Sequence, residues 1–261
     1  MIYLVFRLHN RIFGFAEDTY ARENKQIQVF AWYFARLIVS LQSKDTLKMI
    51  KNELADEMLQ GEMEQTTWSE NVIVADADYI DQVAFNLTVN FERMIGRRIP
   101  LADLARWVEC VALDGGVRQR EEPQVTTVVL VHEKKMDHLR NFMPANYKDE
   151  LNGKAFRSPL GEFAIHTVPV EEITNKTNLL TDIIDVLLQQ KDVKRIMVVP
   201  NAEEGDAYER IRRQLQPVCD EKRITLFAMQ PMPGGNFRQE ILGYSLMQAL
   251  GISGEELGSE S

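Results

Sequence analysis

The sequence predicts an α/β fold, a single doubly wound parallel sheet of about five strands with helices on both faces, preceded by a helical N-terminal extension. From residue 72 onward, short β-rich runs alternate with helical stretches. The strand candidates are almost continuously apolar, which is typical of strands buried on both faces. The whole chain has an ordinary globular composition (45% hydrophobic, 26% charged). About 200 residues are enough for one core of this kind.

The predicted elements follow one another in a regular order. Strands are expected at residues 72–75, 126–132, 163–168, 195–199 and 224–229. Helices are expected at residues 79–94, 101–113, 179–190, 207–215 and 237–250. Pro100 would lie in the first turn of the second helix, and the pair Gly115–Gly116 would end it.

The chain changes character near residue 62. Residues 1–62 are rich in aromatic side chains and contain two helical stretches, and two interpretations stay open. They are a helical extension that packs on the domain or on a partner, or they precede a natural start at Met63. Residues 63–252 form the predicted α/β domain, and residues 253–261 are expected to be a disordered acidic tail.

Several functional classes are disfavoured by composition. The net charge of −9 argues against a protein that coats nucleic acid, although a local patch could still contact RNA. The two cysteines, Cys110 and Cys219, are far apart and form no zinc motif, and no nucleotide-cofactor motif is present. No apolar run is long enough to span a membrane, so a cytoplasmic protein without a membrane partner is the default expectation.

Two acidic loops follow predicted strands. Asp76 and Asp78 come after the first strand, and Glu203, Glu204 and Asp206 come after the fourth. Ligands of such sheets bind at the carboxyl ends of the strands, and carboxylates are the ligands that Mg²⁺ and Mn²⁺ prefer. The alternative is helix capping, by Asp76 or Asp78 in the first loop and by Asp206 in the second.

Phosphate-binding candidates occur in two other segments. The loop after the fifth strand contains Gly234, Gly235 and Asn236 just before a predicted helix, where backbone N–H groups can bind an anion. The pair Lys134 and Lys135 follows the second strand and is expected at the ligand edge of the sheet. The alternatives are a tight structural turn, with Asn236 in a capping box, and a solvated surface.

Three segments together resemble a known family. VIVADADYID, LTDIIDVLLQQ and KRIMVVPNAEEGDAYERIRRQL are similar in order to the NYN/PIN-like ribonuclease domains, which are metal-dependent nucleases on a parallel α/β sheet. The resemblance implies catalytic and metal-binding roles for Asp76 and Asp185, with Glu203, Glu204 or Asp206 as the metal ligand that replaces the family's acidic pair after the fourth strand. Asp78, from its position at the end of the first strand, is a further catalytic candidate beside them. The chain also looks like members of an uncharacterised bacterial family that shares the segments DADYID and MQPMPGGNFRQEILGYS.

Three functional hypotheses follow. The first is a divergent nuclease or phosphodiesterase that uses Mg²⁺ or Mn²⁺ and acts on RNA. The second is a non-catalytic α/β binding module that has lost the site and meets a protein partner, or a second copy of itself, through residues 1–62 or 230–236. The departures from the family pattern, such as Tyr79 and Leu179 at positions where a polar or acidic residue is expected, favour it. The third is a haloacid-dehalogenase-like phosphatase with Asp76 as nucleophile.

Overall fold

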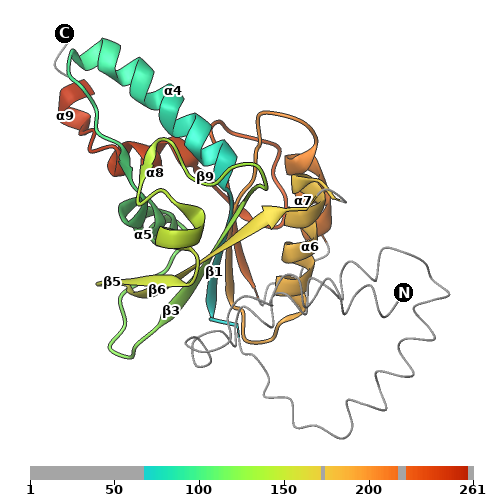
Figure 1. The fold of residues 1–261 in the computed structure, drawn as a ribbon. Coiled ribbons are helices and arrows are strands. Elements are labelled where there is room, and N and C mark those ends of the chain that lie inside the picture. The colour runs from blue at the N-terminus through green and yellow to red at the C-terminus, as the bar shows by residue number, and fades with distance from the viewer. Residues whose placement is uncertain (1–67, 172–173, 217–221, 258–261) are drawn as a thin grey trace, which may run out of the picture. The chain divides into compact units, whose positions relative to one another are not determined.

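The domain contains a seven-stranded sheet whose strands lie in the order β5-β6-β3-β1-β7-β8-β9 (Figure 1). The structure, a computed structural model, describes residues 68–257 apart from 172–173 and 217–221. The predictions for residues 1–62 and 258–261 lie outside these ranges. All neighbouring strands of the sheet run parallel except β5, which pairs with β6 in the antiparallel direction.

The elements follow one another along the chain with these bounds. The strands of the main sheet are β1 (Asn71–Asp76), β3 (Val125–Glu133), β5 (Lys154–Ser158), β6 (Gly161–Val170), β7 (Arg195–Val199), β8 (Arg223–Ala228) and β9 (Arg238–Ile241). A small second sheet pairs β2 (Ala102–Asp103) with β4 (Phe142–Met143). The helices are α4 (Ala77–Ile95), α5 (Leu104–Asp114), η1 (Tyr147–Leu151), α6 (Lys176–Gln189), α7 (Ala207–Leu215), α8 (Leu242–Ala249) and α9 (Gly254–Leu257).

The five predicted strands are confirmed as β1, β3, β6, β7 and β8, and they pair in parallel. Strand β1 lies in the middle of the sheet, where Ala75 pairs with Leu130 of β3 and with Val199 of β7. The chain builds β3 and β6 on one side of β1 and then returns to build β7, β8 and β9 on the other. The carboxyl ends of β1, β3 and β7 therefore meet at one edge.

The expected number of strands was too low, because two edge strands carry little apolar signal. Strand β5 has the sequence KAFRS and is mostly exposed, and β9 has the sequence RQEI. The helix predicted over residues 237–250 was wrong at its beginning, since residues 238–241 pair with β8 and α8 begins only at Leu242. Asn236 and Gln239 therefore do not form a capping box.

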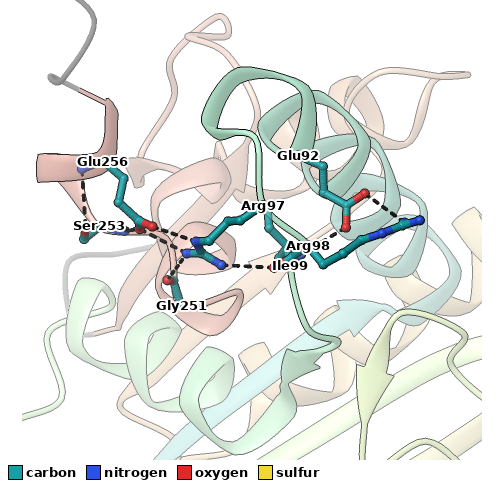
Figure 2. A network of polar contacts seen from close by, with 7 residues as sticks. All are labelled: Glu92, Arg97, Arg98, Ile99, Gly251, Ser253 and Glu256. Atoms are coloured by element: carbon teal, nitrogen blue, oxygen red, sulfur yellow. Dashed lines mark hydrogen bonds and ion pairs between the residues drawn. The ribbon is translucent and has the colours of Figure 1, made fainter.

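Two further boundaries differ from the prediction. Helix α5 begins at Leu104 rather than near Pro100, because the Asp103 side chain accepts a hydrogen bond from the Arg106 backbone N–H at 3.0 Å and caps the helix there. The tail was expected to be disordered from residue 253, but residues 254–257 form α9. Arg97, just after α4, donates to both carboxylate oxygens of Glu256 at 2.7 and 3.0 Å (Figure 2).

Both faces of the sheet are covered by helices. Helices α6 and α7 lie on one side of the sheet, and α5 and α8 lie on the other (Figure 1). Along β1, Ile73 and Ala75 belong to the core that includes α4, α5 and α8, whereas Val72 and Val74 are buried on the opposite face. None of the helices in the described ranges is long and apolar enough to cross a membrane.

Candidate functional site at the carboxyl edge

The candidate site lies where β1 ends, between β3 and β7. The chain adds strands in opposite directions from β1, so the helices that follow β1 and β6 leave the sheet on different sides. In open α/β sheets, ligands bind in the crevice that this reversal creates at the carboxyl ends of the strands. Asp76 is the last residue of β1, and Glu133 is the last residue of β3.

Asp76 caps the helix that follows it. Its backbone is extended, and its Oδ1 atom accepts a hydrogen bond from the Tyr79 backbone N–H at 3.0 Å. The capping alternative for this residue is therefore confirmed. The residue is only 3% exposed, and this burial raises the pKa of its carboxyl group, against the lowering effect of the nearby Lys176 ammonium.

Lys176 is the first residue of α6, and its ammonium group lies between the two aspartates. Its Nζ atom donates to Asp76 Oδ1 at 3.0 Å and to Asp78 Oδ2 at 2.6 Å, and it lies 3.9 Å from Glu133 Oε1. The side chain is only 18% exposed. Burial lowers the pKa of Lys176, but attraction to Asp76 and Asp78 outweighs burial and leaves the pKa above its ordinary value.

Asp78 also connects two elements. Its Oδ2 atom accepts a hydrogen bond from the Glu133 backbone N–H at 2.8 Å, in addition to the bond from Lys176. The first turn of α4, the end of β3 and the start of α6 are thus joined through one carboxylate. We refer to Asp76, Asp78, Glu133 and Lys176 as the lysine-centred cluster.

Two buried aromatic side chains lie near this cluster. The His132 and Tyr147 rings stack with their centroids 3.8 Å apart, and burial lowers the pKa of His132. Burial, together with the negative charges of Asp78, Asp81 and Asp76, raises the pKa of Tyr147. Both rings are thus within electrostatic range of the cluster, where the negative charge of Asp78 acts on each of them.

A neighbouring contact fixes the first part of α4. The Asp81 side chain accepts hydrogen bonds from the Asn141 backbone N–H at 2.8 Å and from its side-chain amide at 3.1 Å. Burial of Tyr79, followed by the negative charge of Glu203, raises the pKa of the Tyr79 hydroxyl. Of the second acidic loop, Glu203 is thus close enough to α4 to influence a buried group.

The five predicted metal ligands do not form one group. Asp185 is exposed on α6, nine residues beyond Lys176, or about 13 Å along the helix axis. Asp206 occupies the N-cap position of α7 without a side-chain capping bond, and Glu203 and Glu204 are exposed in the loop before it. In the part of the chain that the structure describes, no three His, Cys, Asp or Glu side chains are arranged to hold a metal ion. The position between Asp76 and Asp78 is taken by the Lys176 ammonium, so these residues do not fit a resident Mg²⁺ or Mn²⁺.

The predicted phosphate-binding residues fall at two separate places. Lys134 follows β3 and pairs with Glu171 at 2.7 Å, and Lys135 is exposed beside it. Gly234, Gly235 and Asn236 precede β9 on the far side of the sheet. The structure therefore does not bring these two groups to a common site.

Sequence reasoning missed Lys176, although the residue leaves a signal. It begins a helix, directly after the N-cap Asn175. A cation at that position is disfavoured by the positive end of the helix dipole. A lysine there implies that acidic groups lie close by, and the two aspartates after the first strand were the available candidates.

The comparison with protein families identifies a family whose function is unknown. A model described as "Family of unknown function (DUF6621)" matches residues 65–257, well over half of the chain. The chain belongs to DUF6621. No curated protein and no solved structure matches it.

Chemically, the lysine-centred cluster is a neutralised acidic site. The ammonium supplies the positive charge that the two aspartates need, and it does so within hydrogen-bond distance of both. Asp76 has a second bond to the helix backbone, which leaves it little freedom to turn toward a ligand. The cluster can hold three elements together without any bound ion.

Proposed function

We propose that this DUF6621 member is a non-catalytic α/β binding module with a PIN-like, doubly wound domain. One observation carries the proposal, namely that the Lys176 ammonium lies 3.0 Å from Asp76 and 2.6 Å from Asp78. Metal-dependent hydrolysis needs a cation with open positions for water and phosphate. A lysine ammonium offers neither a coordinated water nor a vacant position.

The burial of Asp76 adds support. A catalytic carboxylate must reach either a metal or the substrate, but Asp76 is 3% exposed and caps α4. The same burial disfavours Asp76 as the nucleophile of a haloacid-dehalogenase-like phosphatase. Asp185, the other aspartate that the resemblance marks as catalytic, is exposed and does not contribute to the cluster.

The test combines cleavage and metal binding on the full-length chain. End-labelled single-stranded RNA is incubated with the protein and Mn²⁺ or Mg²⁺, and the melting temperature is measured with and without Mn²⁺. We expect no cleavage above a buffer control. We also expect no metal-dependent rise in melting temperature, because a ligand stabilises a protein only by binding its native state.

Asp78→Asn and Asp185→Asn are the matched variants, one inside the lysine-centred cluster and one outside it. Cleavage by the wild type that Asp78→Asn abolishes would overturn the proposal. A Mn²⁺-dependent rise in melting temperature that is present in the wild type and absent in Asp78→Asn would overturn it as well. Equal, small metal effects on all three proteins agree with the proposal.

A metal-dependent nuclease acting on RNA is the second candidate. Its support is that Asp76, Asp78 and Glu133 each place one carboxylate oxygen within 4 Å of the Lys176 Nζ atom. This point lies at the edge where such sheets bind ligands. For this function Mg²⁺ or Mn²⁺ would have to displace the lysine. The RNA cleavage assay separates the two proposals directly.

A further inference from the structure

We propose that a cavity at the amino ends of β7, β8 and β9 binds the phosphate group of a small organic phosphate. The cavity has a volume of about 390 Å³, within the range of small-molecule sites. It shares no residue with the lysine-centred cluster, so the inference does not depend on the function proposed there. The lining residues are Gly115, Gly116, Arg195, Lys222, Arg223, Ile224, Thr225, Gly235, Asn236, Phe237 and Arg238.

The lining is strongly one-sided in charge. Among the lining residues that the structure describes, four are cationic and none is acidic, although the whole chain carries a net charge of −9. Arg195 and Arg223 are register partners at the first positions of β7 and β8, and Arg238 begins the adjacent parallel strand β9 beside Thr225, two residues further along β8. Cations gathered around a concave space attract anions, because the low-dielectric walls concentrate their field.

Arg195 is the most informative of these residues. It is only 7% exposed, yet its hydrogen bonds go to two neutral acceptors, from Nε to the Gly115 carbonyl at 3.2 Å and from Nη1 to Asn71 Oδ1 at 3.4 Å. A guanidinium has five N–H donors, so within the described residues three stay available for a ligand. Burial, followed by repulsion from Arg223, lowers the pKa of Arg195.

Glu70, the described carboxylate whose charge acts to raise the pKa of Arg195, is already engaged by another arginine. Glu70 accepts two hydrogen bonds from Arg120, at 2.9 and 3.0 Å. Arg238 pairs with Glu240, and Lys222 donates to the Val193 carbonyl at 2.7 Å. A buried guanidinium without a bonded anion is costly, and a phosphate oxygen in the cavity would supply the missing partner.

The turn at Gly116 lies next to the Arg195 side chain. Gly116 has a φ of +86°, and a Cβ atom added there would lie 3.5 Å from Arg195 Nε. The left-handed backbone at this turn favours a glycine, and the distance shows that the turn lies in contact with the guanidinium. The glycine pair that ends α5 thus forms one wall of the cavity.

The size and the other walls specify the class of ligand. Inorganic phosphate alone would fill only a small part of the volume. Gly235 and Asn236, which the sequence predicted to bind phosphate, form another part of the lining, next to the Phe237 ring and Ile224. A phosphate held by arginines with an organic group against these apolar side chains is the ligand that matches the lining.

The experiment measures binding of three probes to the full-length chain by titration calorimetry. The probes are inorganic phosphate, AMP and adenosine, which has the organic part without the charge. We expect phosphate and AMP to bind, AMP more tightly, and adenosine not to bind. Affinity should fall as the salt concentration rises.

Two arginine variants provide the matched comparison. Arg223→Ala removes an exposed cation from the cavity, whereas Arg213→Ala removes an exposed cation from α7 outside it. We expect Arg223→Ala to weaken AMP binding by about tenfold, the effect of one charge-assisted hydrogen bond, and Arg213→Ala to leave it unchanged. Arg195→Met should abolish binding, provided that circular dichroism shows the variant folded.

Three results would overturn the proposal. The first is that neither phosphate nor AMP binds. The second is that adenosine binds as tightly as AMP, which would show that the phosphate is not recognised. The third is an equal loss of affinity in Arg223→Ala and Arg213→Ala, which would indicate a diffuse effect of charge rather than a site.

Discussion

The two edges of the sheet differ in how their buried charges are compensated. At the carboxyl edge, the buried Asp76 meets Lys176, and the charges are balanced within the chain. At the amino edge, the buried Arg195 side chain donates to two neutral oxygens of the described residues and lines a cavity together with other cations. The first arrangement is complete by itself, whereas in the second no carboxylate of the described residues is hydrogen-bonded to the Arg195 side chain.

This difference distinguishes charged groups that hold the fold together from charged groups that are available to bind a ligand. A buried ion pair contributes little net stability, but losing one partner is strongly destabilising because the other is left uncompensated. Replacing a buried cation that has no bonded anion by an apolar residue should change the free energy of unfolding little. Removing the lysine and removing the arginine should therefore have very different consequences.

The largest expected effect is that of Lys176→Met, which leaves Asp76 and Asp78 without their cation. We expect a loss of about 3 kcal/mol in the free energy of unfolding, measured by urea denaturation at pH 7. Lys134→Met is the control, because it breaks the exposed pair with Glu171 and should cost less than about 1 kcal/mol.

Acidification should reduce the loss in Lys176→Met. Burial already raises the pKa of Asp76, and without the lysine the pKa rises further. The folded variant then takes up a proton before the unfolded chain does, so its deficit narrows as the pH falls from 7 toward 4. The double variant Lys176→Met/Asp78→Asn should recover part of the stability. A loss below about 1 kcal/mol in Lys176→Met would contradict the view that the cluster is complete in itself.

A smaller effect is expected from Arg195→Met. The substitution removes two hydrogen bonds to neutral acceptors, each worth about 1 kcal/mol, but it also removes the desolvation penalty of the guanidinium. The net change in the free energy of unfolding should stay within about 1 kcal/mol. A loss above about 3 kcal/mol would show that Arg195 belongs to a balanced network like that of Lys176, and the comparison between the edges would fail.

The sequence predicted the five central strands because their apolar runs are nearly continuous, as in VIVA before Asp76. It failed for β5 and β9, since edge strands are exposed on one side and tolerate charged residues such as Arg157 and Arg238. For the site, it identified Asp76 and Asp78 from their position after a strand. It could not pair them with Lys176, which is 100 residues away from Asp76 along the chain and 3.0 Å away in space.

The smallest expected effect concerns a third pair, in which the charges are exposed. Arg97 holds Glu256 of α9 by two hydrogen bonds and lowers the pKa of that carboxyl to about 2 (Figure 2). Because the folded pKa of Glu256 is lowered, the contact stabilises α9 at pH values above the ordinary pKa of 4.5 and is lost as the pH falls toward 2.

Glu256→Gln should therefore speed hydrogen exchange of the backbone amides of residues 252–257 at neutral pH. The melting temperature and the exchange of β1 should not change, because solvent screens an exposed pair and its opening is local. If Glu256→Gln lowered the melting temperature as much as Lys176→Met does, the exposed Arg97–Glu256 pair would stabilise the fold as much as the buried lysine-centred cluster. Burial would then not set the effect of a charge, and the comparison between the two edges of the sheet would lose its basis.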